Sequence, residues 1–412
     1  MSYIILFIII ILVLEIFLFK FLLKVRNNFQ WLIVKGLDDK INYDQELFEK
    51  FKKHSFSSSL GWEPRAGTKG RDILNGKEIK YEIGNFGQRK CPSDGEKILK
   101  RQILILGDSF AFGRQIDSKY TISNLLNLNS SIKAYNFGVG NYGLDQAFLR
   151  LKKIYNNLKP NYVIFIIVPE TICRIQSSWK HFYEYGNILA FKPRFVECSK
   201  SADLMLMKNP LQFVEKENFE KAVNICKKND KFYLTKFKKD LIKRPYVVNI
   251  FKNKCIAFNL ILSFYFNKLK KKSDSCWQQS KFQDYILKKN AKITDLEYKN
   301  TNSKNLLTKL INEINKYCLE RDIVPIISFI PQYHDLNNKN LRLQNYSKFI
   351  LDLQNVGSIR IIDFKKIFEN FNSPIDNLYL NKVGGTHLSK VGNEVVSKVL
   401  NKEILEIMRK KQ

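Results

Sequence analysis

Short apolar runs alternate with amphipathic stretches through two parts of this chain. The clearest run, Ile103 to Leu106, is followed at once by Gly107-Asp108-Ser109, and an uninterrupted run of this length is typical of a strand buried on both faces. Further strands are predicted at 132–137, 162–168, 323–330 and 359–364, and helical spacing recurs at 120–128, 144–158, 305–321, 341–353 and 388–408. This alternation predicts an α/β domain built on a parallel sheet of five strands with right-handed crossovers.

Two stretches lie outside the alternation. The segment 170–303 is rich in Lys, Phe and Tyr and is largely compatible with helix, so we predict a mostly helical cap or lid in place of one long loop. We expect its aromatic and basic residues to form the core and solvated face of a helical subdomain, with a binding surface as the alternative. The segment 27–98 is predicted as a juxtamembrane linker and small N-terminal region, with a Gly/Pro-punctuated loop over 60–76 and a short strand at 80–83.

The N-terminal residues Tyr3 to Leu23 are nearly all apolar, interrupted by Glu15 and Lys20. A helix of roughly 20 such residues is long enough to cross a bilayer. No small-x-small cleavage site follows, so we predict an uncleaved single-pass membrane anchor over 1–26. Glu15 is costly in lipid unless it is protonated or paired, which leaves an interfacial or core helix as the alternative.

The net charge and the cysteine content limit the classes of partner and cofactor that we expect. The formal charge of +30, from 69 Lys and Arg against 39 Asp and Glu, suggests anionic partners such as nucleic acid, lipid headgroups or acidic glycans. The basic residues are scattered through a sequence rich in Lys, Asn, Ile and Phe, as A/T-rich coding produces, so nucleic acid is not the expected partner. Seven irregularly spaced cysteines without a CxxC pattern predict reduced or buried thiols, with no metal and no cofactor.

Polar residues follow several of the apolar runs. Ser109 follows the first, the glycine-rich turn Gly138–Gly143 the second, and Glu170 the third; His387 lies just before the last helix. Open α/β sheets place their chemistry at the carboxyl ends of the strands, where a serine hydroxyl becomes a nucleophile only beside a base. The alternative is an ordinary turn that happens to contain Gly-Asp-Ser.

Together these segments resemble the SGNH, or GDSL-like, hydrolase family. The matching blocks are Gly107–Phe110, Asn136–Gln146 and Thr386–Asn393, and the resemblance covers about 99–168 and 305–400. It implies a three-layer, flavodoxin-like fold for 99–412, interrupted by the insertion 170–303. It also implies Ser109 as the nucleophile and His387 as the base.

The resemblance further implies an oxyanion hole made by the backbone N–H groups of Ser109 and the glycine turn, including Gly140 and Asn141. Asn141 stands where the family has a glycine, and Asn tolerates the left-handed backbone region well. Asp108 is predicted to orient the Ser109 loop by hydrogen bonding, which we favour over a role in proton transfer.

Two positions depart from the family pattern. Glu170 falls where the family offers an Asn side chain to the oxyanion, a donor whose loss typically costs roughly 10²–10³ in rate. An ionised carboxylate there would repel an oxyanion. Glu170 is therefore expected to be protonated, to point away from the site, or to serve another role. Gly384 stands three residues before His387, where the family carries Asp, so a backbone carbonyl or another carboxylate, such as Asp376, is expected to orient the base.

The leading functional hypothesis is a membrane-anchored serine esterase acting on acyl or acetyl esters of a glycan or lipid. One alternative is an O-acyltransferase or accessory protein in surface-polysaccharide acylation, and another is a non-catalytic binding protein on a degenerate scaffold. Lys20, Lys24 and Arg26 favour a cytoplasmic body, whereas anchored enzymes of this kind often face outward, so the side of the membrane stays open. The oligomeric state is not predicted.

Overall fold

The fold is that of a computed structural model, which describes residues 2–29, 32–34, 41, 43–74, 76–93, 101–198, 203–269, 281–337, 343–381 and 386–410. Five parallel strands form its central sheet: β5 (Arg101–Gly107), β6 (Ile132–Gly138), β7 (Tyr162–Ile167), β10 (Val324–Phe329) and β11 (Arg360–Asp363). Their spatial order is β11-β10-β7-β5-β6, which is the doubly wound, flavodoxin-like order 2-1-3-4-5. The predicted α/β fold with a five-stranded parallel sheet is confirmed.

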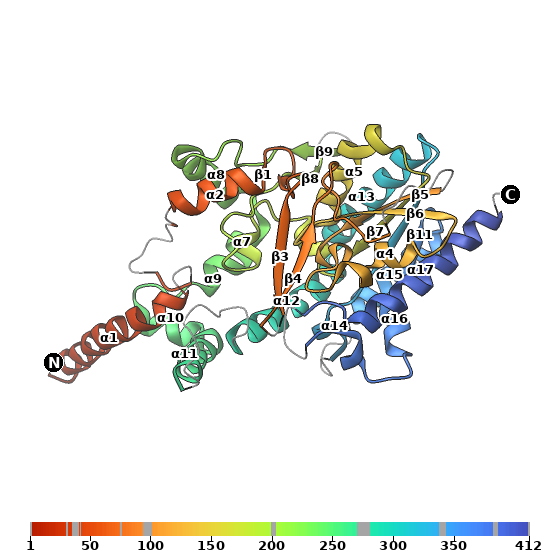
Figure 1. The fold of residues 1–412 in the computed structure, drawn as a ribbon. Helices are drawn as coiled ribbons and strands as arrows, with labels where there is room; N and C mark the ends of the chain where they lie inside the picture. The colour runs from red at the N-terminus through yellow and green to blue at the C-terminus, as the bar shows by residue number, and fades with distance from the viewer. Residues whose placement is uncertain are drawn as a thin grey trace.

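Helices cover both faces of this sheet (Figure 1). Along β5, Leu104 and Leu106 belong to the same core as α5 (Leu144–Leu158), α13 (Thr301–Leu319) and α15 (Gln344–Val356). Ile103 and Ile105 belong to a second core with α4 (Ile122–Leu126), α16 (Phe364–Glu369) and α17 (Lys390–Lys410). These four side chains are fully buried, and burial of each stabilises the fold by roughly 1.5–3 kcal/mol relative to exposure. The apolar run therefore serves two cores at once.

The insertion is mostly helical, as predicted, and shares the first core with the sheet. Its helices are α6 (Thr171–Arg174), α7 (Lys180–Tyr183), α8 (Lys216–Asn229), α9 (Lys238–Asp240), α10 (Tyr246–Lys252), α11 (Lys254–Leu269) and α12 (Lys281–Lys299), with a π-helical turn at Tyr233–Phe237. It also contains an antiparallel hairpin of β8 (Arg194–Glu197) and β9 (Leu204–Met207) that the sequence did not predict. Within the insertion, the buried side chain of Trp179 stacks on Phe191, with ring centroids 4.5 Å apart.

The N-terminal region contains more strand than the sequence predicts. Its elements are α2 (Gln45–His54), β1 (Phe56–Ser57), β2 (Gly61–Trp62), β3 (Lys69–Leu74) and β4 (Lys77–Glu82). The loop predicted over 60–76 is wrong at two places. Strand β2 pairs antiparallel with β1, and β3 pairs antiparallel with β4 from Lys69–Glu82 to Leu74–Lys77. Side chains in β3 are exposed or half-buried in alternation, so no apolar run marks the strand.

The remaining elements complete the connections. They are α3 (Ser109–Phe112), α14 (Tyr333–Asn337) and 3₁₀ turns at Ser118–Tyr120 and Ile375–Leu378. The helix predicted over 120–128 is thus a 3₁₀ turn followed by the short α4, capped by Thr121, whose side chain accepts from the backbone N–H of Asn124.

Helix α1 (Ser2–Phe29) projects from the body of the protein (Figure 1). Its stretch Tyr3–Lys24 is long and apolar enough to cross a membrane, a property that the helix shares with signal sequences.

Candidate active site

Two glycines bring the tip of β5 close to its neighbours. Gly107 has φ +140°, and a Cβ there would lie 1.8 Å from the carbonyl oxygen of Ile166 in β7. A Cβ on Gly138, at the end of β6, would lie 2.2 Å from the backbone nitrogen of Phe112 in α3. These approaches exclude a side chain at either position, and they hold the start of α3, with Ser109, against the carboxyl ends of β6 and β7.

Ser109 and His387 meet at this edge. Ser109 Oγ lies 2.9 Å from His387 Nε2 although 278 positions separate the two residues in the sequence. His387 precedes α17, and its carbonyl accepts a hydrogen bond from the backbone N–H of Leu380. Ser109 is 9% exposed, so the pair is sheltered but open to solvent. This separation is within the reach that nucleophile and base require.

Gln115 holds the other nitrogen of the imidazole, with Oε1 2.9 Å from His387 Nδ1. Its amide nitrogen Nε2 donates to the carbonyl of Ile73 in β3 at 3.4 Å, which leaves the amide oxygen facing the ring. Nδ1 must then carry the proton, because Oε1 can only accept. Nε2 is left with a lone pair, and it accepts the hydrogen bond that the hydroxyl of Ser109 donates.

No pattern in the sequence marks Gln115. It has φ +62°, and its backbone N–H donates to the Asp72 carboxylate of β3 at 2.9 Å, so an unpredicted strand positions an unpredicted residue. Asp376, the carboxylate that we suggested would orient His387, accepts a hydrogen bond from the hydroxyl of Tyr333 at 2.9 Å. Gly384, which raised the question, lies outside the described residues.

The glycine turn lies next to the serine loop. The backbone N–H of Val139 donates to the carbonyl of Gly107 at 3.0 Å, and Asn141 has φ +71°, the left-handed region expected for it. Trp62 of β2 braces the turn by donating from Nε1 to the carbonyl of Gly140 at 2.9 Å. Across the described ranges no acceptor is found for the backbone N–H groups of Ser109, Gly140 and Asn141, so these donors are available for an oxyanion.

Glu170 is paired. Its Oε2 accepts from Arg174 Nη2 at 3.2 Å and from Gln332 Nε2 at 2.9 Å. Arg174 Nη1 also bonds to Asp108 Oδ2 at 3.1 Å and to the carbonyl of Tyr142 at 3.0 Å. Of the three outcomes expected for Glu170, the contacts favour another role. Its carboxylate helps to position Arg174, which bonds to residues of three loops.

Asp108 connects this network to the loop that carries Ser109. Its Oδ1 accepts from the backbone N–H of Phe110 at 2.9 Å and its Oδ2 from that of Val168 at 3.1 Å. Burial raises the pKa of Asp108, although Arg174 acts against the rise. Burial by itself would lower the pKa of Arg174, but Glu170 and Asp108 outweigh it and the pKa is raised. Arg174, absent from the sequence-based site, therefore remains a cation shared by two buried carboxyl groups.

The imidazole of His387 is held in its neutral form. Burial, reinforced by the positive charges of Arg114 and Arg174, lowers the pKa of His387 to about 3. An unperturbed histidine titrates near 6.5. A neutral imidazole with a free lone pair on Nε2 is the form that can accept the proton of Ser109.

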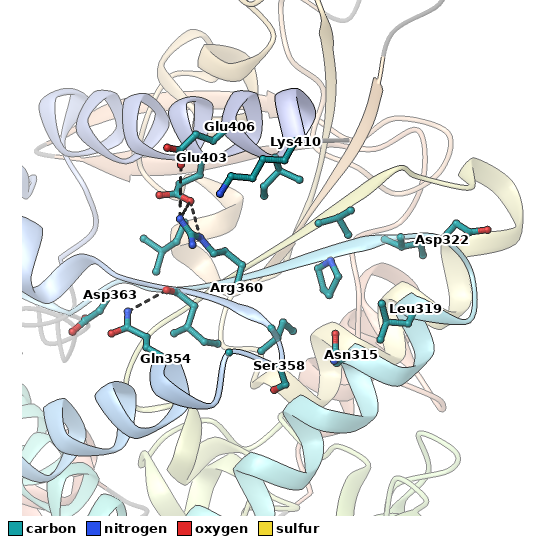
Figure 2. Close-up of a pocket in the computed structure, with 18 of the residues that line it drawn as sticks. Asn315, Leu319, Asp322, Gln354, Ser358, Arg360, Asp363, Glu403, Glu406 and Lys410 are labelled. Atoms are coloured by element: carbon teal, nitrogen blue, oxygen red, sulfur yellow. Dashed lines mark hydrogen bonds and ion pairs between the residues drawn. The ribbon is translucent and has the colours of Figure 1, made fainter. Parts of the chain in front are cut away.

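A separate groove of about 820 Å³ runs along the edge strand β11 of the sheet (Figure 2). It is lined at the amino ends of β10 and β11 by residues that include Val324 and Arg360, and by Glu403 of α17. Arg360 forms an ion pair with Glu403 there, and Gln354 donates to the carbonyl of Ile361. Neither Ser109 nor His387 lines this groove, so it is not part of the candidate active site.

No protein-family model matches this chain, and no curated protein matches it. Similar solved structures include a lipolytic protein of the G-D-S-L family from Desulfitobacterium hafniense (11% identity, TM-score 0.33, 73% of this chain and 99% of that chain covered). Others are a lipase/acylhydrolase from Enterococcus faecalis (13%, 0.34, 74% and 95%) and a catalytic mutant of an acetylxylan esterase from Geobacillus stearothermophilus (12%, 0.32, 75% and 96%). The chemistry of this chain is therefore inferred from its own side-chain geometry.

Proposed function

We propose that this protein is a serine esterase that hydrolyses acyl esters, with Ser109 as nucleophile and His387 as general base. The observation that carries the proposal is the contact of 2.9 Å between Ser109 Oγ and His387 Nε2. The Gln115 contact at Nδ1 adds to it, because it selects the tautomer that leaves Nε2 able to accept the hydroxyl proton.

The proposed reaction has two halves. The hydroxyl oxygen of Ser109 bonds to the ester carbonyl carbon while its proton passes to His387 Nε2, and the carbonyl electron pair moves onto the oxygen. The N–H groups of Ser109 and Asn141 are proposed to hold that oxyanion. Collapse breaks the bond to the alcohol, which takes the proton from His387. Water then attacks the acyl-enzyme by the same route and releases the carboxylic acid.

The proposed substrates are acyl or acetyl esters of a glycan or a lipid. The apolar helix α1 supports a substrate near a membrane, because it would hold the body of the protein there. An O-acyltransferase would use the same Ser109 and His387 and pass the acyl group to a sugar hydroxyl in place of water.

Labelling by a fluorophosphonate probe tests the proposal directly. The native protein should be labelled, and both Ser109→Ala and prior heating should abolish labelling. A folded protein that is never labelled would argue for the non-catalytic alternative. Product analysis with and without a glycan acceptor separates the two catalytic possibilities, since only a transferase forms the acylated acceptor.

Removing the Gln115 side chain is expected to slow the reaction modestly. Gln115→Ala deletes one neutral hydrogen bond, worth about 0.5–1.5 kcal/mol, so kcat/KM should fall by roughly 2- to 12-fold. Gln115→Glu replaces it with a charge-assisted bond and should move the acid limb of the pH–rate profile to higher pH. Gln354→Ala is the matched control, because the Gln354 amide donates to the carbonyl of Ile361 in the groove along β11, which neither Ser109 nor His387 lines. Equal rates for the two alanine variants would contradict the positioning role.

The pH profile should lack the limb usual for histidine. Because the pKa of His387 is lowered to about 3, kcat/KM should stay flat on lowering the pH from 8 through 6 towards 5. An unfolded histidine binds its proton near pH 6.5, so the folded state loses stability between about pH 6.5 and 3. Circular dichroism at each pH should therefore accompany initial rates with a soluble aryl ester. An acid limb near pH 6.5 in folded protein would show that His387 is not a neutral base with a lowered pKa.

A further inference from the structure

Glu15, the acidic interruption of the apolar helix α1, has partners in the insertion. Its two carboxylate oxygens accept from the backbone N–H groups of Tyr246 and Val247, at 2.7 and 2.9 Å. Both donors lie in the first turn of α10. A charge that is costly in lipid when isolated is thus satisfied by an element that lies more than two hundred positions away in the sequence.

Further contacts fasten α10 to the same part of α1. The ring of Phe19 stacks on that of Tyr246 with centroids 5.9 Å apart, and Arg244 lies 4.8 Å from the Phe19 centroid. Leu22 is 1% exposed and belongs to the core of the body. One side of α1 between Glu15 and Leu22 is therefore docked, whereas Ile16, Phe17 and the large apolar residues from Tyr3 to Leu14 are exposed.

The two helices α10 and α11 meet at a bend of 102°, and they expose large apolar side chains. Phe251 is 76% exposed and Phe258 64%. Tyr265, seven positions beyond Phe258 and so on the same helical face, is 48% exposed. Exposed aromatic residues grouped in this way mark an interaction surface. Figure 1 shows α10 and α11 gathered at the base of α1, where it leaves the body.

Exposed lysines border the apolar side chains. Lys252 and Lys254 flank the bend, and Lys20 lies on α1 beyond Glu15. Aromatic and aliphatic side chains bordered by lysines form the pattern of an element that lies in a membrane surface, with its cations among anionic headgroups. The net charge of +30 adds to the attraction for such a surface.

The dimensions agree with this placement. Lys20 is five residues from Glu15, or about 7.5 Å along the helix axis. If Lys20 lies among the headgroups, Glu15 and the start of α10 are submerged by about that distance, within the 5–10 Å typical of interfacial helices. From Lys20 back to Tyr3, α1 covers about 26 Å, close to the roughly 27–30 Å of a bilayer core.

We propose that α10 and α11 form a membrane-surface element that lies in the same leaflet as the docked end of α1 and binds anionic lipid. This inference rests on α1 as the proposed anchor and goes beyond the proposed esterase activity. The insertion would then hold the body of the protein at a fixed distance from the bilayer, whereas a flexible linker would let that distance vary. The substrate that such an arrangement favours is an ester carried by a membrane-resident molecule.

Depth-dependent quenching tests the proposal on the full chain. Phe251→Cys and Phe258→Cys are made with Cys198, Cys255 and Cys276 replaced by serine, labelled with an environment-sensitive fluorophore, and reconstituted into phosphatidylcholine–phosphatidylglycerol vesicles. Both labels should shift to shorter emission wavelength and should be quenched more strongly by lipid nitroxides near the headgroup than by those near the chain end. Phe213→Cys is the matched control, because Phe213 is 62% exposed and lies in neither α10 nor α11.

Labels at 251 and 258 that behave like the label at 213, open to aqueous iodide and insensitive to lipid nitroxides, would overturn the proposal. Adding Lys252→Glu and Lys254→Glu should lower the lipid quenching at 258 in these anionic vesicles; unchanged quenching would overturn the role of anionic lipid. Hydrolysis of a soluble aryl ester by the same samples reports the proposed esterase separately, so failure of one proposal is not mistaken for failure of the other.

Discussion

Replacing Ser109 by alanine is expected to lower the rate of ester hydrolysis by roughly 10⁴-fold or more without lowering the free energy of unfolding appreciably. The substitution removes only the hydroxyl group that bonds to His387 Nε2. The N–H groups proposed for the oxyanion hole remain, so weak residual catalysis should persist. Initial rates with p-nitrophenyl acetate and urea unfolding curves measure the two effects.

His387→Ala should produce a loss of similar size, and the double variant should lose little more, because a nucleophile without its base is as ineffective as no nucleophile. Ser131→Ala is the matched control, since Ser131 precedes β6 at the amino end of the sheet. If Ser109→Ala kept more than about a tenth of native activity, the chemistry would have to lie elsewhere in the protein.

Replacing Arg174 by methionine is expected to destabilise the fold by about 3–5 kcal/mol, because it leaves buried carboxyl groups without their cation. Asp108 and Glu170 are both buried, at 0% and 5% exposure, and each lies close to the guanidinium, at 3.1 and 3.2 Å. Activity should fall as well, since Asp108 orients the loop that carries Ser109. Urea unfolding gives the stability, and aryl-ester hydrolysis under native conditions gives the activity.

Arg360→Met is the matched control for this substitution. Arg360 also pairs with a carboxylate, Glu403, but its side chain is 51% exposed, and surface pairs are worth about 0–1 kcal/mol. Adding Glu170→Gln to Arg174→Met should restore part of the stability by removing one of the unpaired charges. Equal unfolding midpoints for Arg174→Met and the native protein would show that the buried carboxyl groups do not depend on Arg174.

The elements that could be predicted from the sequence are those with a local signal. The strands β5 and β7 are apolar runs because their side chains serve two cores, and the run Ile103–Leu106 shows this most clearly. In contrast, β3 exposes charged residues on one face and half-buries the other. Its stability comes from pairing with β4 and from contacts to a loop more than forty positions away, which no local pattern records.

The same distinction applies to the candidate site. Ser109 and Asn141 were predictable because a strand tip and a glycine-rich turn mark them. Gln115 was not, because its role depends on where Asp72 and Ile73 place it. Glu170 looked like an obstacle in the sequence, since nothing there shows that an arginine four positions later bridges it to Asp108.

The separation of Ser109 and His387 along the sequence affects when, during translation, the proposed catalytic pair can form. Ser109 precedes His387 by 278 positions, which at roughly 5–20 residues per second is about 14–56 s of synthesis. A nascent chain therefore presents the alcohol long before the imidazole exists, while α1 has already emerged and can reach the lipid. If Ser109 and His387 form the proposed catalytic pair, ribosome-stalled fragments that stop short of His387 should not hydrolyse esters, and hydrolysis should begin only after synthesis has passed His387.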